Sequence, residues 1–169
     1  MQKIIKHRFG VSAGRFWTDV YFNHEYTQGL FLEGMGCAAY RLVAEEGVPG
    51  EHYARTIQST PKLNAPGAVK KVLGDSMSYT ESGSFNPETK KYTFEVVPST
   101  MADKIKIQGT YWVEALSENE VERICSLDFS VKMFGVGKMV EQFIAQQYVD
   151  NQELAAAYTT RWIHEHIRA

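Results

Sequence analysis

The sequence predicts an α+β fold in which a curved, seven-stranded antiparallel sheet packs against one long C-terminal helix. Three observations support this prediction. Apolar and polar residues alternate through most of the chain, two short helical segments interrupt the alternation after the first strand, and a helical period extends from Gly137 to Ile167. The 169 residues contain neither an internal repeat nor a linker, so we expect a single domain over residues 1–169.

The first strand is predicted over residues 3–11, KIIKHRFGV, and two short helices follow it. The segment SAGRFWTDVYFN, residues 12–23, begins with a serine, a residue that commonly accepts a hydrogen bond from the backbone of the first helical turn. Its aromatic and aliphatic residues recur with the period of an amphipathic helix. Residues 25–35, EYTQGLFLEGM, indicate a second short helix, which the glycines at its end terminate.

Six more strands are predicted before the C-terminal helix, and turn-forming sequences such as GVPG and NPETK separate several of them. They are expected over residues 37–46, 51–60, 77–85, 91–98, 104–116 and 120–134. The segment PKLNAPGAVKKVLGDS interrupts the series with one apolar turn, Val69, Val72 and Leu73, beside two lysines. It indicates a packed connecting helix; the alternatives are a lid or a turn that contacts a lipid surface.

Alternation in the last strand separates a dry face from a wet one. Arg123, Cys125, Leu127 and Phe129 share one face, and acidic or serine side chains occupy most of the positions between them. The strand before it alternates in the same way. An antiparallel sheet with one wet face needs a cover over its dry face.

The C-terminal helix is the expected cover. It would extend about 45 Å at a rise of 1.5 Å per residue. Its apolar stripe is predicted to contain Val136, Val140, Phe143, Leu154, Tyr158 and Trp162. Because a long helix touches a strongly curved sheet along only part of its length, we expect a space between them, filled either by side chains or by a ligand.

Composition excludes several functional classes. The net charge of −2 and the pI near 6.2 do not favour nucleic acid as a partner, because phosphate binding needs a basic stripe. From the residues at the N-terminus we expect neither a signal peptide nor a membrane-spanning run. Two cysteines, Cys37 and Cys125, are too few for a disulfide scaffold, so we expect a cytoplasmic protein. A transient contact with a membrane stays open, and the oligomeric state is not predicted.

The C-terminal segment FGVGKMVEQFIAQQYVDNQELAAAYTTRWI resembles the glycine-containing entry and grip helix of an uncharacterised bacterial family in the START-like superfamily, also called the helix-grip or birch-pollen-allergen fold. The segments PGAVKKVLGDS and ADKIKIQGTYWV are similar to that family too, and the resemblance covers essentially the whole chain. A weaker likeness, in HRFGVSAGRFWTDVYF, is to the VASt (Aster) and PRELI lipid-transfer domains. Members of the superfamily typically enclose an apolar ligand, and a minority are cyclases or hydrolases.

Two short motifs are interpreted as structural. Gly135-Val136-Gly137-Lys138 lacks the spacing and the following Ser or Thr of a Walker loop, so its glycines are predicted to turn the chain from strand into helix. His164 and His166 lie two residues apart on a helix and point to different sides, so they cannot share one metal ion. We expect neither a metal nor a cofactor.

Two charged side chains are predicted to point inward. Glu81 shares a face with Tyr79, and Arg55 shares one with Tyr53. They could orient the polar head of a ligand, with Tyr111 and Arg123 as further donors; the alternatives are a structural ion pair and a register slip that places both outside. The predicted ligand-binding residues are Tyr53, Arg55, Tyr79, Glu81, Phe94, Tyr111, Arg123, Leu127, Phe129 and Phe143. The alternative for the aromatic residues is that they simply fill the core.

The leading functional hypothesis is binding, with intracellular transfer as an extension, of a hydrophobic small molecule or lipid such as a sterol, a fatty acid or a phospholipid. The second hypothesis is a cyclase-like or hydrolytic enzyme that uses Glu81 or Tyr111 as an acid or base. The third is a scaffold without a pocket. The sequence favours binding over catalysis, because one inward carboxylate does not make a mechanism and Cys125 has no evident histidine partner.

Overall fold

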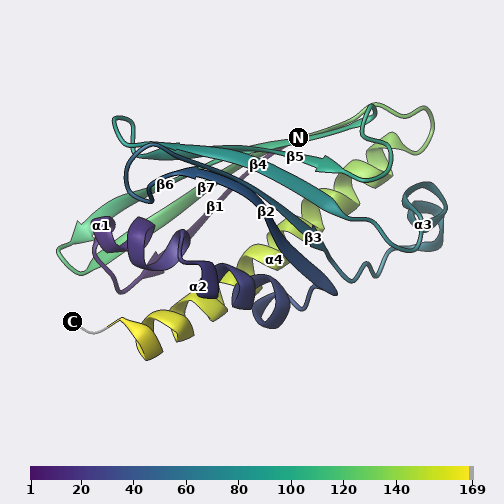
Figure 1. The fold of residues 1–169 in the computed structure, drawn as a ribbon. Coiled ribbons are helices and arrows are strands. Elements are labelled where there is room, and N and C mark those ends of the chain that lie inside the picture. The colour runs from purple at the N-terminus through teal and green to yellow at the C-terminus, as the bar shows by residue number, and fades with distance from the viewer. Residues whose placement is uncertain (168–169) are drawn as a thin grey trace.

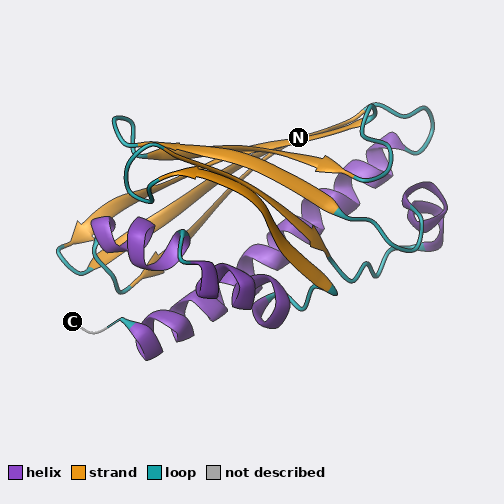
Figure 2. Ribbon diagram, in the orientation of Figure 1, coloured by secondary structure: helices purple, strands orange, loops and turns teal. Residues whose placement is uncertain are grey.

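The computed structural model describes residues 1–167 and shows a curved antiparallel sheet with helices on its concave side (Figures 1 and 2). The strand order is β1-β7-β6-β5-β4-β3-β2. The strands are β1 (Gln2–Phe9), β2 (Ala39–Gly47), β3 (Tyr53–Thr60), β4 (Tyr79–Asn86), β5 (Lys91–Pro98), β6 (Ile105–Ser117) and β7 (Glu120–Val131). The predicted seven-stranded helix-grip architecture is confirmed.

The two predicted short helices each continue into a π-helical segment. The helical elements are α1 (Ala13–Arg15), η1 (Phe16–Tyr21), α2 (His24–Gly29), η2 (Leu30–Gly34), α3 (Gly67–Leu73) and α4 (Gly137–His166). The side chain of Ser12 accepts a hydrogen bond from the backbone nitrogen of Arg15, as its position predicted. Asn23 caps α2 in the same way, accepting from the backbone nitrogen of Tyr26 at 2.9 Å.

The sheet buries its concave face. Strand β5 alternates strictly between exposed and buried residues, so Tyr92, Phe94 and Val96 point into the core. Register irregularities lie between Leu42 and Ala44 in β2 and between Ala115 and Ser117 in β6. Such irregularities bend strands locally, which suits a sheet that curves around a helix.

Helix α4 crosses the concave side of the sheet and ends below α2, where the two helices converge (Figure 1). The predicted apolar stripe is wrong at Leu154, whose side chain is 48% exposed. The buried positions in this part of the helix are instead Gln152, Ala155, Tyr158 and Thr159. These residues keep helical spacing, but two of them are polar, because this part of the helix faces other polar groups.

Glycines allow one sharp turn and one close approach of the backbone. Gly135 has a φ of +79°, which lets the chain turn from β7 into α4 as the sequence predicted. Gly34, at the end of η2, lies so near α4 that a Cβ there would meet the Cβ and Cγ of Tyr158 at 2.9 Å. This close approach brings η2 directly against the long helix.

Helix α3 is the predicted connecting helix, and it contacts α4. Its Val69 and Leu73 are buried, whereas Lys70 and Lys71 face solvent. The apolar edge therefore packs inward and is not available to a lipid surface. Within residues 1–167, no helix is both long and apolar enough to cross a membrane.

Candidate functional site

A cavity of about 100 Å³ lies between the concave face of the sheet, the π-helical segment η2 and the middle of α4. Most of its wall is aromatic or aliphatic, with Tyr21, Ile57, Phe94 and Val96 among the contributors. Most of its half-buried lining residues are contributed by η2 and the segment after it, by the end of β3 and the residue after it, and by α4 near Gln147; Glu81 on β4 is half-buried as well. The cavity therefore reaches the surface between these three parts of the chain.

Glu81 is the acidic residue of the cavity wall. The hydroxyl of Tyr92 donates a hydrogen bond of 3.0 Å to its Oε1. Burial raises the pKa of the Glu81 carboxyl, and the nearby Arg55 guanidinium and the Tyr92 hydrogen bond offset part of that rise. Within the described chain, Glu81 and Arg55 form no direct ion pair, the alternative that the sequence left open, although their charges interact at longer range.

Arg55 is held by neutral groups. Its Nη1 donates to the backbone oxygen of Tyr21 at 3.4 Å and to the Oγ1 of Thr27 at 3.3 Å. Its guanidinium carbon lies 5.1 Å from the centroid of the Tyr21 ring and 5.3 Å from that of Phe22. These contacts join β3 to η1 and α2.

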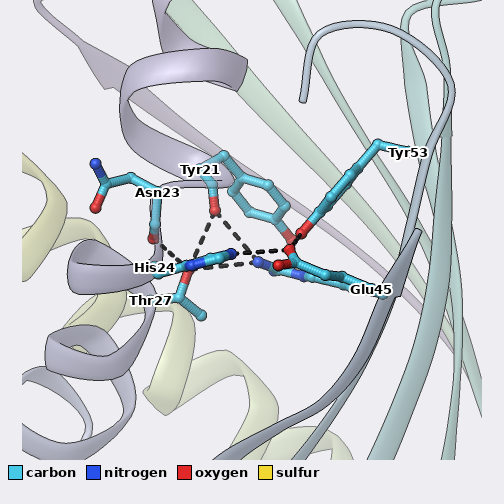
Figure 3. A network of polar contacts seen from close by, with 7 residues as sticks. Tyr21, Asn23, His24, Thr27, Glu45 and Tyr53 are labelled. Carbon is cyan, nitrogen blue, oxygen red and sulfur yellow. Dashed lines mark hydrogen bonds and ion pairs between the residues drawn. The ribbon is translucent and has the colours of Figure 1, made fainter. Parts of the chain in front are cut away.

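A second polar network lies beside Arg55 and anchors α2 to the edge of the sheet (Figure 3). The Oε2 of Glu45 accepts a 2.6 Å hydrogen bond from the hydroxyl of Tyr53 and lies 2.8 Å from the Nε2 of His24. The hydrogen bonds from Tyr53 and His24 lower the pKa of the Glu45 carboxyl. Tyr53, predicted as a ligand-binding residue, thus binds the edge strand β2.

Arg123 occupies the other side of the cavity and links three elements. Its Nη2 donates to the Oε1 of Gln152 at 3.0 Å and to the Nδ1 of His7 at 3.1 Å. Because Nδ1 accepts, the hydrogen of the His7 ring is on Nε2, which lies 2.9 Å from Glu153. Gln152 in turn donates from Nε2 to the hydroxyl of Tyr111 at 2.7 Å. This chain of contacts runs from the exposed Glu153 to the cavity wall.

Several polar atoms of the wall have no hydrogen-bond partner among the described residues. They are the Nε of Arg55, the Nε of Arg123 and the hydroxyl of Tyr79. All three side chains are buried and all three line the cavity. Buried polar atoms are nearly always paired, so these atoms mark places where a bound molecule could supply the partner.

The structure brings together six of the ten predicted ligand-binding residues. Those in the cavity wall are Arg55, Tyr79, Glu81, Phe94, Tyr111 and Arg123. The other four lie outside the wall. Leu127 and Phe129 are fully buried core residues of β7, Phe143 packs against the core from the first half of α4, and Tyr53 contacts Glu45.

The contribution of α4 and of the segments near η2 to the cavity was not predicted from the sequence. Tyr148, Asn151, Gln152 and Ala155 line the cavity from α4, at spacings of three and four residues. That spacing was visible in the sequence, but a search for apolar residues passes over a stripe that contains asparagine and glutamine. Cys37, another wall residue, follows η2 and was considered only for disulfides.

Among residues 1–167, no group of three His, Cys, Asp or Glu side chains is arranged to hold a metal ion. Burial raises the pKa of the Cys125 thiol to about 12. The chemical groups that the cavity wall provides are hydrogen-bond donors, one carboxyl group and apolar surface.

Residues 7–163 match the model of a family described as "Protein of unknown function (DUF2505)". The chain belongs to the DUF2505 family. None of the curated proteins matches the sequence of this DUF2505 protein.

Solved structures similar to the DUF2505 chain share its fold at low sequence identity. The Zhui aromatase/cyclase from Streptomyces sp. R1128 has a TM-score of 0.68 at 11% identity, covering 100% of this chain and 98% of that one. Norcoclaurine synthase from Thalictrum flavum, in complex with dopamine and hydroxybenzaldehyde, has a TM-score of 0.64 at 19% identity, with coverages of 100% and 90%. A START superfamily protein from Mycobacterium smegmatis has a TM-score of 0.59 at 12% identity, with coverages of 96% and 98%. The expected START-like fold of the DUF2505 chain is confirmed.

Proposed function

We propose that the protein binds a small hydrophobic molecule in the cavity between the sheet and α4. The observation that carries this proposal is the set of unpartnered buried donors, on Arg55, Tyr79 and Arg123, in a wall that is otherwise largely apolar. Apolar walls supply affinity in proportion to the ligand surface that they bury, at about 25 cal/mol per Å². A few polar groups then fix the orientation of the ligand.

The size of the cavity supports a ligand with a single ring. A cavity of about 100 Å³ is close to engineered apolar cavities of about 150 Å³ that bind benzene. Pockets for drug-sized ligands occupy about 300–1,000 Å³. A sterol, fatty acid or phospholipid, the ligands that the sequence suggested, would require a larger cavity than this one. The observed volume therefore favours binding of a small molecule over lipid transfer.

One of the structural relatives contains ligands of the same size class. The norcoclaurine synthase structure contains dopamine and hydroxybenzaldehyde, two compounds with one aromatic ring each. The Zhui protein is an aromatase/cyclase. At 11% and 19% identity these likenesses show the fold alone, so the proposal rests on the wall of the cavity in this chain.

A cavity-filling variant tests the proposal. Ala155 is buried in the wall, and Ala157, on the same helix, is exposed. Single-ring probes such as phenol and benzyl alcohol should bind saturably to the wild type and to Ala157→Leu but not to Ala155→Leu. Protection of Cys37, which lines the cavity, from a thiol reagent provides the readout.

Thermal unfolding curves check that Ala155→Leu is folded. We expect it to be, because a leucine side chain that enters empty space should lower the free energy of unfolding by less than the roughly 1–3 kcal/mol of true overpacking. The proposal fails if no single-ring probe binds the wild type and native mass spectrometry of protein from its own cells shows no retained molecule. Binding that survives in Ala155→Leu would place the ligand elsewhere.

One observation favours a second function, acid–base catalysis on the bound molecule. Burial raises the pKa of Glu81, which lines the cavity, and a carboxyl group with a raised pKa suits proton donation near neutral pH. Under this hypothesis, Glu81→Gln abolishes turnover of a single-ring carbonyl compound while probe binding persists. Loss of probe binding in the same variant would make Glu81 a group that orients the ligand.

A further inference from the structure

The two arginines of the cavity wall are buried, and within residues 1–167 neither makes a direct ion pair with a carboxylate. The residues Arg55 and Arg123 are only 7% and 3% exposed. Among residues 1–167, every ion pair that forms involves other side chains. A guanidinium stays protonated in proteins, and an unpaired buried charge is strongly unfavourable. Two such charges on one wall are expected where a ligand supplies the opposite charge.

The acidic groups near the cavity compensate Arg55 better than Arg123. Glu81 is the one carboxylate among the wall residues that the structure describes, against two guanidiniums. Its electrostatic partner is Arg55. Among residues 1–167, Arg123 contacts an acidic residue only through the ring of His7, and that residue, Glu153, has a side chain that is 66% exposed. The uncompensated positive charge therefore lies at the Arg123 end of the cavity.

Two hydrogen-bond donors remain available at that end. The Nε of Arg123 has no partner, although its Nη2 donates to the Oε1 of Gln152. The Tyr111 hydroxyl accepts from the Nε2 of Gln152, and within the described chain its own proton is directed to the sulfur of Cys125, a weak acceptor that a carboxylate oxygen can replace. Because one carboxamide contacts both side chains, Gln152 holds the two donors close together.

Aromatic rings adjoin these donors. The Tyr111 ring stacks on Phe94 with 5.1 Å between centroids and lies 5.6 Å from the Tyr21 ring. The guanidinium carbon of Arg123 lies 5.7 Å from the same Tyr111 ring. Charge, donors and flat apolar surface therefore meet at one end of the cavity.

We propose that the ligand is a small aromatic carboxylic acid whose carboxylate accepts hydrogen bonds from the Nε of Arg123 and the hydroxyl of Tyr111. This inference rests on the proposed function and specifies its ligand class. A carboxylate provides two acceptor oxygens and the missing negative charge, whereas a neutral carbonyl provides acceptors alone. The adjoining Phe94 and Tyr21 rings hold the aromatic part of the acid.

The test compares benzoate with benzamide, its uncharged counterpart of the same shape, on the wild-type chain. Isothermal titration should show benzoate binding about tenfold or more tightly than benzamide, as charge-assisted hydrogen bonds are stronger than neutral ones.

Two variants test the assigned donors. Arg123→Lys keeps the charge but loses the planar guanidinium, and Tyr111→Phe loses the hydroxyl. Both variants should lower benzoate affinity about tenfold while changing benzamide affinity by less than about threefold. Arg41→Gln, on the exposed side of β2, is the control for loss of an arginine.

Each outcome separates this inference from the proposed function. Equal binding of benzoate and benzamide to the wild type overturns the carboxylate inference and leaves hydrophobic binding intact. Binding of neither compound, or of any other single-ring probe, overturns the proposed function itself. If both variants still prefer benzoate but Arg55→Lys does not, the anion binds at Arg55 and not at Arg123, and the assigned site is refuted. Inorganic phosphate that displaces benzoate at comparable concentration would show a general anion site instead. If Arg123→Lys does not fold, the wild-type comparison and Tyr111→Phe still decide.

Discussion

The Nε2 of Gln152 donates a 2.7 Å hydrogen bond to the hydroxyl of Tyr111, and this contact joins the middle of α4 to β6. The Oε1 of the same side chain accepts from Arg123 on β7. One buried carboxamide therefore attaches the long helix to two neighbouring strands at the wall of the cavity. A helix that bears polar residues at its buried positions depends on such contacts, because apolar packing is interrupted there.

Replacing this glutamine should destabilise the fold. Gln152→Ala leaves the Tyr111 hydroxyl and one Arg123 hydrogen unpaired in a buried position, so we expect a loss of about 1–3 kcal/mol in the free energy of unfolding. Gln142→Ala, at an exposed position on the same helix, should change it by less than about 0.5 kcal/mol. Urea unfolding measures both. Equal effects of the two substitutions would show that water replaces the glutamine without loss.

The approach of η2 to α4 should not tolerate a methyl group. In Gly34→Ala the added Cβ would lie 2.9 Å from the Cβ and Cγ of Tyr158, and that Cβ moves only with the helix backbone. We expect a destabilisation of about 1–3 kcal/mol from this overpacking. The control is Gly14→Ala, whose Cβ would meet nothing within 4 Å. Thermal unfolding compares them, and a wild-type melting temperature for Gly34→Ala would mean that the segment is loosely packed in solution.

Stability should depend on pH through Glu81. Burial raises the pKa of its carboxyl in the folded protein above the ordinary value of 4.5, so between those two values the folded state binds more protons than the unfolded chain. The contribution of Glu81 to stability therefore falls as the pH rises through this window. Over the same pH range, the free energy of unfolding of Glu81→Gln should rise progressively relative to that of the wild type. Above that range the difference between the two should stay constant.

Urea unfolding at a series of pH values from about 4 to 8 tests this dependence. Glu95→Gln, on the exposed side of the adjacent strand β5, controls for removal of one negative charge and should not reproduce the trend. A relative stability of Glu81→Gln that decreases with rising pH would mean that the folded state favours the ionised carboxyl.

The two cysteines should differ in reactivity. Cys37 is half-buried at the cavity wall, whereas Cys125 is fully buried and its pKa is raised to about 12. Because the thiolate is the reactive form, a thiol reagent at about pH 8 should label Cys37 first and leave Cys125 unmodified in the folded protein. Peptide mass mapping distinguishes the two sites. Rapid labelling of Cys125 would show that the concave face opens to solvent.

Part of the candidate site followed from local pattern. Period-two alternation placed Tyr79, Glu81 and Arg123 on the inward faces of their strands, and the structure shows all three in the cavity wall. The same alternation made Leu127 and Phe129 equally good candidates, although they lie in the solid core. A strand pattern gives the direction of a side chain but not its distance from the helix that covers it.

The pattern of α4 was harder to interpret. Leu154 was assigned to the buried stripe because it is apolar, yet the buried side of the helix passes through Gln152 and Ala155. Polar residues are acceptable there because Tyr111 and Arg123 pair with the glutamine across the cavity. Tyr111 lies 41 residues and Arg123 lies 29 residues from Gln152 in the chain, so a pattern among neighbouring residues could not reveal these contacts.

The order of the elements, the buried faces of β6 and β7 and the start of the long helix follow from the sequence, because each depends on periodicity and turn chemistry within a few residues. Only the three-dimensional packing establishes which inward side chains meet, that Arg55 and Arg123 form no direct ion pair within residues 1–167, and that a cavity of about 100 Å³ stays open beside them. These properties depend on how closely a curved sheet and a helix approach, and that distance is set by contacts between residues far apart in the chain.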